Sequence, residues 1–255
     1  MPTPTTIDKW KWSDAISRRE WDEKYQYFNF IYPPVTSNKV GGASSGTAGD
    51  ENLMISPEGQ LEYHIIGTQS ILAPVVTTIS AGVSALNIAM DQTNTDGVEV
   101  CAGIINSNRN AFKTSTDAAF FFRVRYAIGT VAGTDDCAIG FRKVEAYQAA
   151  IDNYGDMAAL NTIAGDIKIE TILAGAGTVT TDTTDDWADA AVHELKVLVS
   201  SAGVCTYLID GVAPTTTAAF TFAAGTWVVP FFYLLNNATL TATLYIYEWE
   251  CGYQS

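Results

Sequence analysis

Strict alternation of apolar and polar residues is the feature that most restricts what this chain can fold into. In the run FFFRVRYAIG every second residue from Phe120 to Tyr126 is apolar, while Arg123 and Arg125 lie between them. The run HELKVLVSS (193–201) repeats the pattern. Successive side chains of a β-strand point to opposite faces, so each run predicts a strand with one buried and one solvent-facing side.

Turn signals separate these runs at short intervals. They are Asp96-Gly97, Ser201-Ala202-Gly203, Asp210-Gly211 and Asn236-Asn237. Many short strands joined by such turns predict an antiparallel β-sandwich. The alanine-rich residues 144–164 depart from the pattern, and there we expect one or two helical turns in a crossover connection. The most apolar run, residues 220–235, is shorter than the ~20 residues of a membrane-spanning helix and contains Pro230, so we interpret it as two buried strands.

The first forty residues have a different character. They hold three of the six tryptophans, and an apolar stripe with helical spacing runs from Ile16 to Phe28. The following GGASSGTAGD has the composition of a flexible connector. We therefore expect an all-β protein in three parts: an extended, partly helical N-terminal docking arm (1–39), a Gly/Ser-rich connector (40–59) and a β domain (60–255).

The net charge of −14 is unevenly distributed. Residues 1–39 carry six basic and five acidic side chains, so the remaining residues hold about −15. A body of that charge repels phosphate and argues against nucleic acid as a partner. The N-terminus has no apolar signal region, and the four cysteines lie far apart without paired spacing. We expect buried free thiols, no zinc site, no membrane association and synthesis in a reducing cytoplasm.

One passage, ADAAVHELKVLVSSAGVCTYLIDGVAP (188–214), resembles the laminin-G and concanavalin A-like jelly rolls. There a strand of the form His-x-Leu-x-Val-x-Val is followed by a Gly turn and by a strand that ends in Ile-Asp-Gly. The resemblance covers about residues 60–253 and implies that the β domain is a jelly roll. Lectins, glucanases, adhesion modules and virus structural proteins all use this fold, so it does not choose among them.

An N-terminal arm followed by a lectin-like jelly roll also resembles structural proteins of tailed bacteriophages. That resemblance implies a virion protein on the capsid exterior, made in the host cytoplasm. The role expected from it is capsid decoration or cementing, with the major capsid protein and neighbouring copies of the chain as partners. Such a protein would be a homo-oligomer, for which a trimer would be natural.

The aromatic arm is the segment expected to dock on such a partner. Aromatic and arginine side chains are enriched in the centres of protein interfaces. The residues assigned to docking are Trp10, Trp12, Arg18, Arg19, Trp21, Tyr25, Phe28, Phe30 and Tyr32.

The alternative function is glycan binding by a module of a phage head or tail fibre. Sugar sites combine an aromatic platform with carboxylate or amide hydrogen bonds. Candidate contacts are Trp187, with Asp185 and Asp186 beside it, and Trp227 near a strand end. No cofactor or metal is expected. Calcium on the acidic loop Asp182–Asp189 is the alternative to a solvated loop.

Catalytic residues are not expected. Glu248 and Glu250 fall on one face of a strand, as the carboxylates of glucanases with this fold do, but the third acidic position of that motif is missing. Residues 42–46, GASSG, match the nucleophile elbow in letters only, since no hydrophobic strand precedes them. The two histidines, His64 and His193, are too few and too far apart to suggest a two-histidine metal site.

Overall fold

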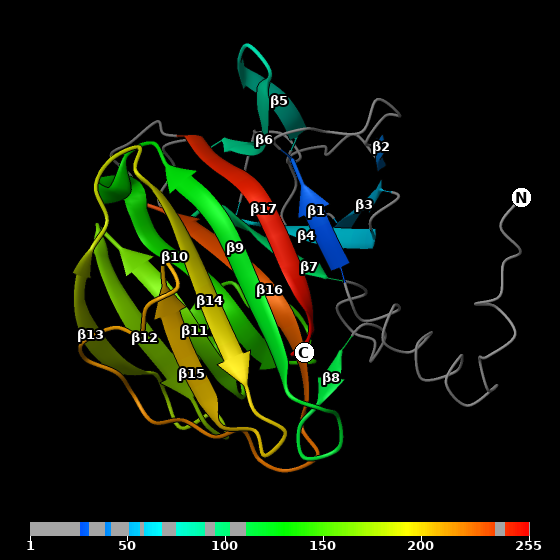
Figure 1. Ribbon diagram of the computed structural model, residues 1–255, viewed down its shortest axis with the longest axis vertical. Coiled ribbons are helices and arrows are strands. Elements are labelled where there is room, and N and C mark those ends of the chain that lie inside the picture. Colours follow the sequence, from blue (N-terminus) through cyan, green and yellow to red (C-terminus); the bar gives the residue numbers. More distant parts are fainter. Residues whose placement is uncertain are drawn as a thin grey trace, which may run out of the picture.

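Two antiparallel sheets packed face to face make up the computed structural model of the chain (Figure 1). The structure describes residues 26–30, 39–41, 51–56, 59–67, 75–89, 95–102, 111–237 and 243–254. Nearly every described element is a strand, and the two short helices, η2 (Val131–Gly133) and η3 (Ile151–Asn153), are single 3-10 turns. No described helix is long and apolar enough to cross a membrane.

The smaller sheet has seven strands, six of them in one row. In spatial order the row is β15 (Cys205–Ile209), β14 (Val192–Val199), β9 (Phe120–Ile128), β17 (Thr243–Tyr253), β6 (Val83–Ala89) and β5 (Val75–Ser80). The seventh, β1 (Gln26–Asn29), lies alongside the second half of β17 (Figure 1).

The larger sheet has ten strands, nine of them in one row. In spatial order the row is β13 (Val179–Asp186), β12 (Asp166–Ile172), β11 (Met157–Ile163), β10 (Thr134–Lys143), β16 (Trp227–Asn236), β7 (Gly97–Ala102), β4 (Gly59–Ile66), β3 (Glu51–Ser56) and β2 (Lys39–Gly41). The tenth, β8 (Phe112–Lys113), pairs with the start of β16.

The core between the sheets is made by the residues that the alternation predicts to be buried. On the inner face of β9 the side chains of Phe120, Phe122, Val124 and Tyr126 are fully buried, and so are those of the same face of β14. They meet β10 across the sandwich, where the rings of Phe122 and Phe141 lie 6.2 Å apart. Trp249 of β17 packs on Phe122 with ring centroids 4.5 Å apart. The prediction of these strands and of their buried faces is confirmed.

A second apolar cluster covers the other face of the ten-stranded sheet. Residues 144–156, here called the covering segment, connect β10 to β11 and place Ile151 and Tyr154 on this outer face, where both are buried. One helical turn is present in it, η3, as expected for the alanine-rich stretch. The prediction was wrong beyond residue 156, because Met157–Ile163 form strand β11, whose apolar residues are buried on both faces.

Pro230 lies inside β16, a strand paired on both sides. On one side, β16 pairs with β8 through Trp227 and Val228, and then with β7 from Phe231 onward. The proline falls in the gap between these two partners, where the strand needs no N–H donor on that side. The run 220–235 therefore contributes one long strand, preceded by a bridge between Thr221 and Val204.

The hairpin that carries the jelly-roll resemblance forms as expected. β14 pairs with β15 in register from Leu195↔Ile209 to Val199↔Cys205. After β15 the chain turns tightly at Asp210 and Gly211, whose φ angles of +50° and +80° are left-handed. The backbone of Ile209 and Val212 closes that turn with hydrogen bonds of 2.8 and 3.0 Å.

The end of the predicted helical stripe is a strand. Residues Gln26–Asn29 form β1 and pair with β17 from Gln26↔Cys251 to Asn29↔Glu248. Phe28 and Phe30 are each only 3% exposed and belong to the core between the sheets. The expectation of a helix through residue 28 was wrong, because period-two burial against β17 outweighs the helical spacing. The rest of that stripe lies outside the described residues.

The expected division into arm, connector and domain stays a prediction. Strands β1, β2 and β3 all precede residue 60, yet they pair with strands of the two sheets. All four cysteines, Cys101, Cys137, Cys205 and Cys251, are buried and unpaired, as expected.

Phe28→Ala tests whether β1 belongs to the folded core. Deleting a fully buried phenylalanine side chain removes its transfer free energy and leaves a cavity, so unfolding should require about 3–5 kcal/mol less. Chemical denaturation of the purified protein measures this loss. Tyr27→Ala, on the half-buried outer side of the same strand, is the matched control and should cost clearly less. Equal, small effects of both substitutions would show that β1 is not part of the core.

Candidate functional site

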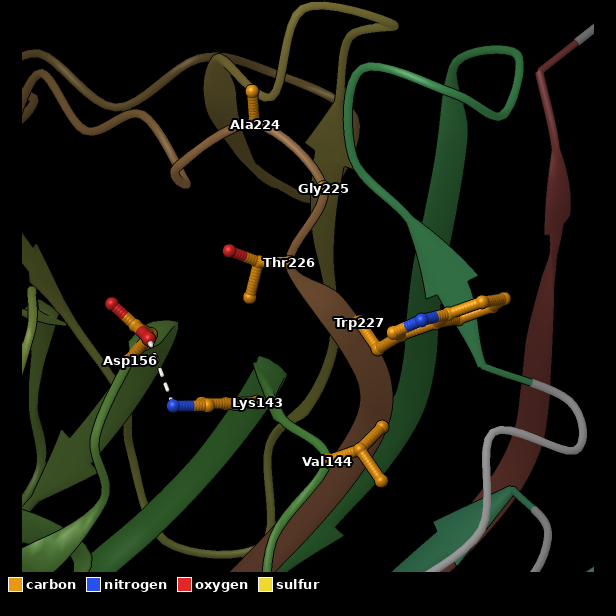
Figure 2. A pocket seen from close by; sticks show the side chains of 7 residues that line it. All are labelled: Lys143, Val144, Asp156, Ala224, Gly225, Thr226 and Trp227. Atoms are coloured by element: carbon orange, nitrogen blue, oxygen red, sulfur yellow. Dashed lines mark ion pairs between the residues drawn. The ribbon is translucent and has the colours of Figure 1, made fainter.

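A pocket opens at the end of the ten-stranded sheet, where β10 ends and β16 begins (Figure 2). It encloses about 290 Å³. The residues that line it are Lys143, Val144, Asp156, Ala224, Gly225, Thr226 and Trp227. Val144 and Asp156 are the two ends of the covering segment, so the pocket lies where that segment leaves the sheet and returns to it.

Trp227, the first residue of β16, borders the pocket, and its ring points away from Lys143 and Asp156 toward β8 (Figure 2). Its side chain is half-buried and packs against the outer apolar cluster. Lys113, its partner across the β8–β16 pairing, places Nζ 5.4 Å from the centroid of the ring. The indole is therefore held between an apolar base and a cation, and it remains partly open to solvent.

The opposite side of the pocket is polar. Figure 2 shows Lys143 and Asp156 facing each other, with Nζ and Oδ2 4.0 Å apart, and Thr226 above them. The Lys143 side chain is 48% exposed, whereas that of Asp156 is 11% exposed. The other carboxylate oxygen of Asp156 accepts a hydrogen bond of 2.9 Å from the backbone N–H of Ala174. The carboxylate is thus fixed, and the amine is a weakly held donor.

Thr114 holds the loop that forms the rim. Its side chain is fully buried, and its Oγ1 donates to the carbonyl of Ala223 over 2.6 Å and accepts from the N–H of Thr226 over 3.1 Å. Its carbonyl accepts from the N–H of Gly225 over 2.9 Å. Gly225 has a φ of +79°, a left-handed backbone that glycine adopts without strain. The rim is therefore fixed by the fold.

A fully buried ion pair lies next to the pocket. Arg142 Nε donates to Glu99 over 2.6 Å, and neither side chain is exposed. Arg142 Nη1 also donates to the carbonyls of Lys143 and Glu145, 2.9 and 3.1 Å away. The hydroxyl of Tyr154 donates to the second oxygen of Glu99. Together these bonds tie the covering segment to β7 and β10.

Burial and neighbouring charges together shift the pKa values of Arg142 and of Tyr154 beside it. Burial disfavours the charged form of Arg142, but the carboxylate of Glu99 outweighs it and raises the pKa of the guanidinium. Burial, and then the negative charge of Glu99, raise the pKa of Tyr154 far above its ordinary value. The arginine stays charged and the tyrosine stays a hydrogen-bond donor.

The sequence-predicted glycan contacts divide between surface and core. Trp227 lines the pocket, as a sugar contact would. Trp187 is only 2% exposed, and its ring contacts those of Tyr126 and His193. A ring buried to that degree offers no surface to a sugar, so its assignment was wrong. Asp185 and Asp186 remain at the surface, apart from the pocket residues.

The arm residues assigned to docking are placed only in part. Phe28 and Phe30 lie in the core of this chain and are therefore not available to fill grooves of another protein. Their assignment as docking residues was wrong, because the seven-stranded sheet already covers them. The other assigned residues lie outside the described part of the chain: Trp10, Trp12, Arg18, Arg19, Trp21, Tyr25 and Tyr32.

Glu248 and Glu250 share one face of β17, as the alternation predicts, and both bind Arg123. Arg123 Nη1 donates to Glu248 over 3.0 Å and to Glu194 over 2.7 Å, and its Nε donates to Glu250. Burial opposes the charge of this arginine, but the three carboxylates raise its pKa. Both carboxylates therefore have a structural partner in one guanidinium.

The histidines and the acidic loop show no metal-binding geometry. His64 stacks on Tyr147 with centroids 3.8 Å apart, and His193 Nδ1 lies 2.7 Å from Asp210. In the loop expected as the calcium alternative, Asp182 and Asp189 bind the separate backbone N–H groups of Thr184 and Val131. Within the described ranges, no three His, Cys, Asp or Glu side chains gather closely enough to hold a metal ion.

Most of the pocket could not be found from the sequence. Lys143, Asp156 and Thr226 come from three separate segments, and only the pairing of β10 with β11 and β16 brings them to one place. The one usable signal was Trp227, a tryptophan directly after a glycine turn at the start of an apolar strand.

No family model matches this sequence, and no curated protein matches it. Solved structures share the fold. One is a protein of unknown function from Shewanella oneidensis MR-1, with a TM-score of 0.51 and 11% identity over 99% of this chain and 97% of that chain.

Two further similar structures have known roles. They are the Emp47p carbohydrate recognition domain (TM-score 0.48, 9% identity, 76% of this chain and 89% of that chain) and an alginate lyase from Pseudomonas aeruginosa (TM-score 0.44, 12% identity, 79% and 86%). At such identities the likeness concerns the fold alone. The chain is thus an all-β protein built as an antiparallel jelly-roll sandwich.

Two carboxylates bind one side-chain amide, that of Asn161, on the outer face of the ten-stranded sheet. Asn161 Nδ2 donates to Asp136 over 2.7 Å and to Glu170 over 2.8 Å, while its Oδ1 accepts from the N–H of Cys137 over 2.8 Å. Burial is the main reason that the pKa of Asp136 rises to about 6, and the charge of Glu170 adds to it. Burial also raises the pKa of Glu170.

Asp136→Asn should change how stability depends on pH. Between about pH 4 and pH 6 the folded protein holds a proton on Asp136 that the unfolded chain has lost, so this group stabilises the fold below that range and ceases to do so as the pH rises through 6. The free energy of unfolding of the variant minus that of the wild type should therefore increase as the pH is raised from 4 to 7. Chemical denaturation at several pH values measures the difference. Asp186→Asn, at an exposed position, is the control, and an equal trend in it would contradict the assignment.

Proposed function

We propose that this protein is a binding module that recognises a carbohydrate in the Trp227 pocket. The observation that carries the proposal is a concavity that holds an amine, a carboxylate and a hydroxyl and is bordered by Trp227, whose half-buried indole lies beside it. Small-ligand sites are commonly concave and mostly apolar, with a few fixed polar groups that set orientation and specificity.

The chemistry of the pocket suits a sugar ring in two ways. One face of a pyranose carries C–H groups that pack on an aromatic surface, which Trp227 offers. The ring edge carries hydroxyl groups, which can donate to the fixed carboxylate of Asp156 and accept from the Lys143 ammonium. Asp156 is already oriented by Ala174, so little side-chain freedom is lost when it binds.

The size of the pocket limits the ligand. A space of about 290 Å³ holds one or two sugar units and is too small for a long segment of chain. Longer glycans would extend beyond the rim, past Ala224 and Gly225, which present no bulky side chain.

Trp227→Ala tests the proposal on a glycan array. We expect the wild-type protein to bind a defined set of sugars and the variant to lose about fivefold or more in affinity, since one stacked aromatic contributes on the order of 1 kcal/mol or more. Titration calorimetry with the best sugar then gives the ratio.

Phe121→Ala is the matched control for this test. Phe121 is also a half-buried aromatic beneath a lysine, with Lys196 Nζ 4.5 Å from its ring centroid, but it belongs to β9 in the other sheet. Its loss should leave sugar binding unchanged. A wild-type protein that binds no sugar, or a loss shared equally by both variants, would refute the pocket as a glycan site.

A second candidate function, capsid decoration through the N-terminal arm, is favoured by one observation. The arm is joined to the sandwich by β1, which is paired with β17 and packed into the core. Residues 1–25 therefore start from a fixed point at the sheet, which a docking element that displays the jelly roll on a capsid needs. Their aromatic and arginine side chains suit a protein groove, and bridging of neighbouring subunits would stabilise the shell by mass action.

A protein lacking residues 1–25 tests this second function without disturbing the core, because it keeps β1. We expect the full chain to co-sediment with undecorated capsids from its source and the shortened chain to remain in the supernatant. A full-length variant with Trp10, Trp12 and Trp21 changed to alanine should fail in the same way. Attachment by the shortened chain would place the docking surface elsewhere.

A further inference from the structure

Lys143 and Asp156 face each other in the pocket without forming a hydrogen bond. Lys143 Nζ and Asp156 Oδ2 lie 4.0 Å apart (Figure 2). That distance exceeds the roughly 2.7–3.2 Å of an N–H···O hydrogen bond. The ammonium and the carboxylate oxygen can therefore each form a short hydrogen bond with a ligand that enters the pocket.

The backbone around the pair fixes where these two side chains start. The N–H of Lys143 donates to the carbonyl of Asp156 over 2.8 Å, so the end of β10 and the residue before β11 are direct neighbours. The N–H of Ala174 holds the other carboxylate oxygen of Asp156 over 2.9 Å. The Lys143 side chain is 48% exposed, and the long chain can adjust. The pair thus offers a ligand one fixed acceptor and one adaptable donor.

Thr226 adds a hydroxyl group beside the pair. Its N–H donates to Thr114 Oγ1 over 3.1 Å, and its carbonyl accepts from the N–H of Thr114 over 3.0 Å. The backbone of Thr226 is therefore fixed. Figure 2 shows its side chain on the same side of the chain as Lys143 and Asp156, whereas the ring of Trp227 points to the other side. The polar groups of the pocket thus converge without the indole.

The spacing of the pair suits two adjacent hydroxyl groups of a sugar ring. Neighbouring ring hydroxyls that are not both axial have their oxygens about one hydrogen-bond length apart. One of them can donate to Asp156 Oδ2 while the next accepts from Lys143 Nζ, so that two hydrogen bonds run side by side across the 4.0 Å span. A single hydroxyl serving both groups would have to place its two hydrogen bonds at nearly a right angle.

The charges of the pair favour a neutral ligand. A carboxylate or sulfate that approaches Lys143 also comes close to Asp156, which when ionised is only an acceptor. An ammonium group that approaches Asp156 comes equally close to Lys143. The net charge of −14 repels polyanions at longer range as well. Uronic acids, sulfated sugars and amino sugars are therefore disfavoured.

We propose that Lys143 and Asp156 recognise two adjacent hydroxyl groups of one neutral sugar ring. The first hydroxyl donates to Asp156 Oδ2, and the second accepts from Lys143 Nζ. The inference rests on the proposed sugar-binding function and adds the class of ligand to it: neutral sugars with two free neighbouring hydroxyl groups. It makes no use of the indole of Trp227, so the two proposals can fail separately.

Calorimetry of the full-length protein with defined sugars tests the inference. The probes are the methyl glycosides of glucose, galactose and mannose, followed by the monodeoxy analogues of the one that binds best. We expect two adjacent positions to matter, with about tenfold or more loss of affinity at each, because each hydroxyl bonds to a charged group. Uronic acid counterparts should bind more weakly than the neutral glycosides.

Two variants assign each hydroxyl to its partner. Lys143→Met should weaken binding of the parent glycoside by a similar factor, and removing the hydroxyl that Lys143 binds should then have no further effect. Asp156→Asn should behave in the same way toward the other hydroxyl. Lys168→Met is the matched control, because Lys168 lies 3.6 Å from Asp166 on the same sheet but outside the pocket. Its affinity should equal that of the wild type.

The possible results separate this inference from the proposed function. Sugar binding that is weakened by Trp227→Ala but depends on one hydroxyl, on two that are not adjacent, or on none would overturn the inference and leave the proposed function standing. Tighter binding of a uronic acid than of its neutral counterpart would do the same. A protein that binds none of these glycosides and no sugar on the array would overturn both.

Discussion

The ion pair between Arg142 and Glu99 is the constraint on which one end of the ten-stranded sheet depends, the end where the pocket opens. Both side chains are fully buried, and charges in such a place are tolerated only when every donor and acceptor is satisfied. Here Tyr154 and two backbone carbonyls complete the set. Removing one partner alone would leave a buried charge, at a cost of about 3–5 kcal/mol. The pair thereby fixes the covering segment, whose two ends form part of the Trp227 pocket.

The other sheet uses an arginine differently. Arg123 is 18% exposed and gathers three carboxylates on the outer face, so its contacts are screened by water and individually weak. These contacts hold the guanidinium over the ring of Tyr27 in β1. Arg142 thus fixes a buried segment, whereas Arg123 links β9, β14 and β17 to the outer side of β1.

Period-two alternation predicted the fold because burial in a sandwich depends on which face a side chain occupies. It identified β9 and β14, and the Asp210-Gly211 turn followed from glycine chemistry. It failed where a helical and a strand period overlap. Phe28 fits the spacing of a helical stripe, but together with Phe30 it also fits the alternation of a strand. Only the pairing with β17 decides that this segment is a strand. Trp187 was misplaced because nothing local distinguishes a surface indole from one covered by Tyr126 and His193. The pocket depends on pairing between distant segments, which no local pattern contains.

The change of partner along β16 at Pro230 has a consequence for how this protein can evolve. Residues beyond the proline are locked between β7 and β10 in the centre of the sheet, whereas Trp227 and Val228 meet only the two-residue β8 on that side. On that side the rim of the pocket is therefore held by β8 and not by the long strand β7. Substitutions at Trp227, Lys113 and the neighbouring glycine loop can therefore change the shape of the pocket while leaving the register of the sandwich intact. Related sequences should diverge most quickly there and keep their strands.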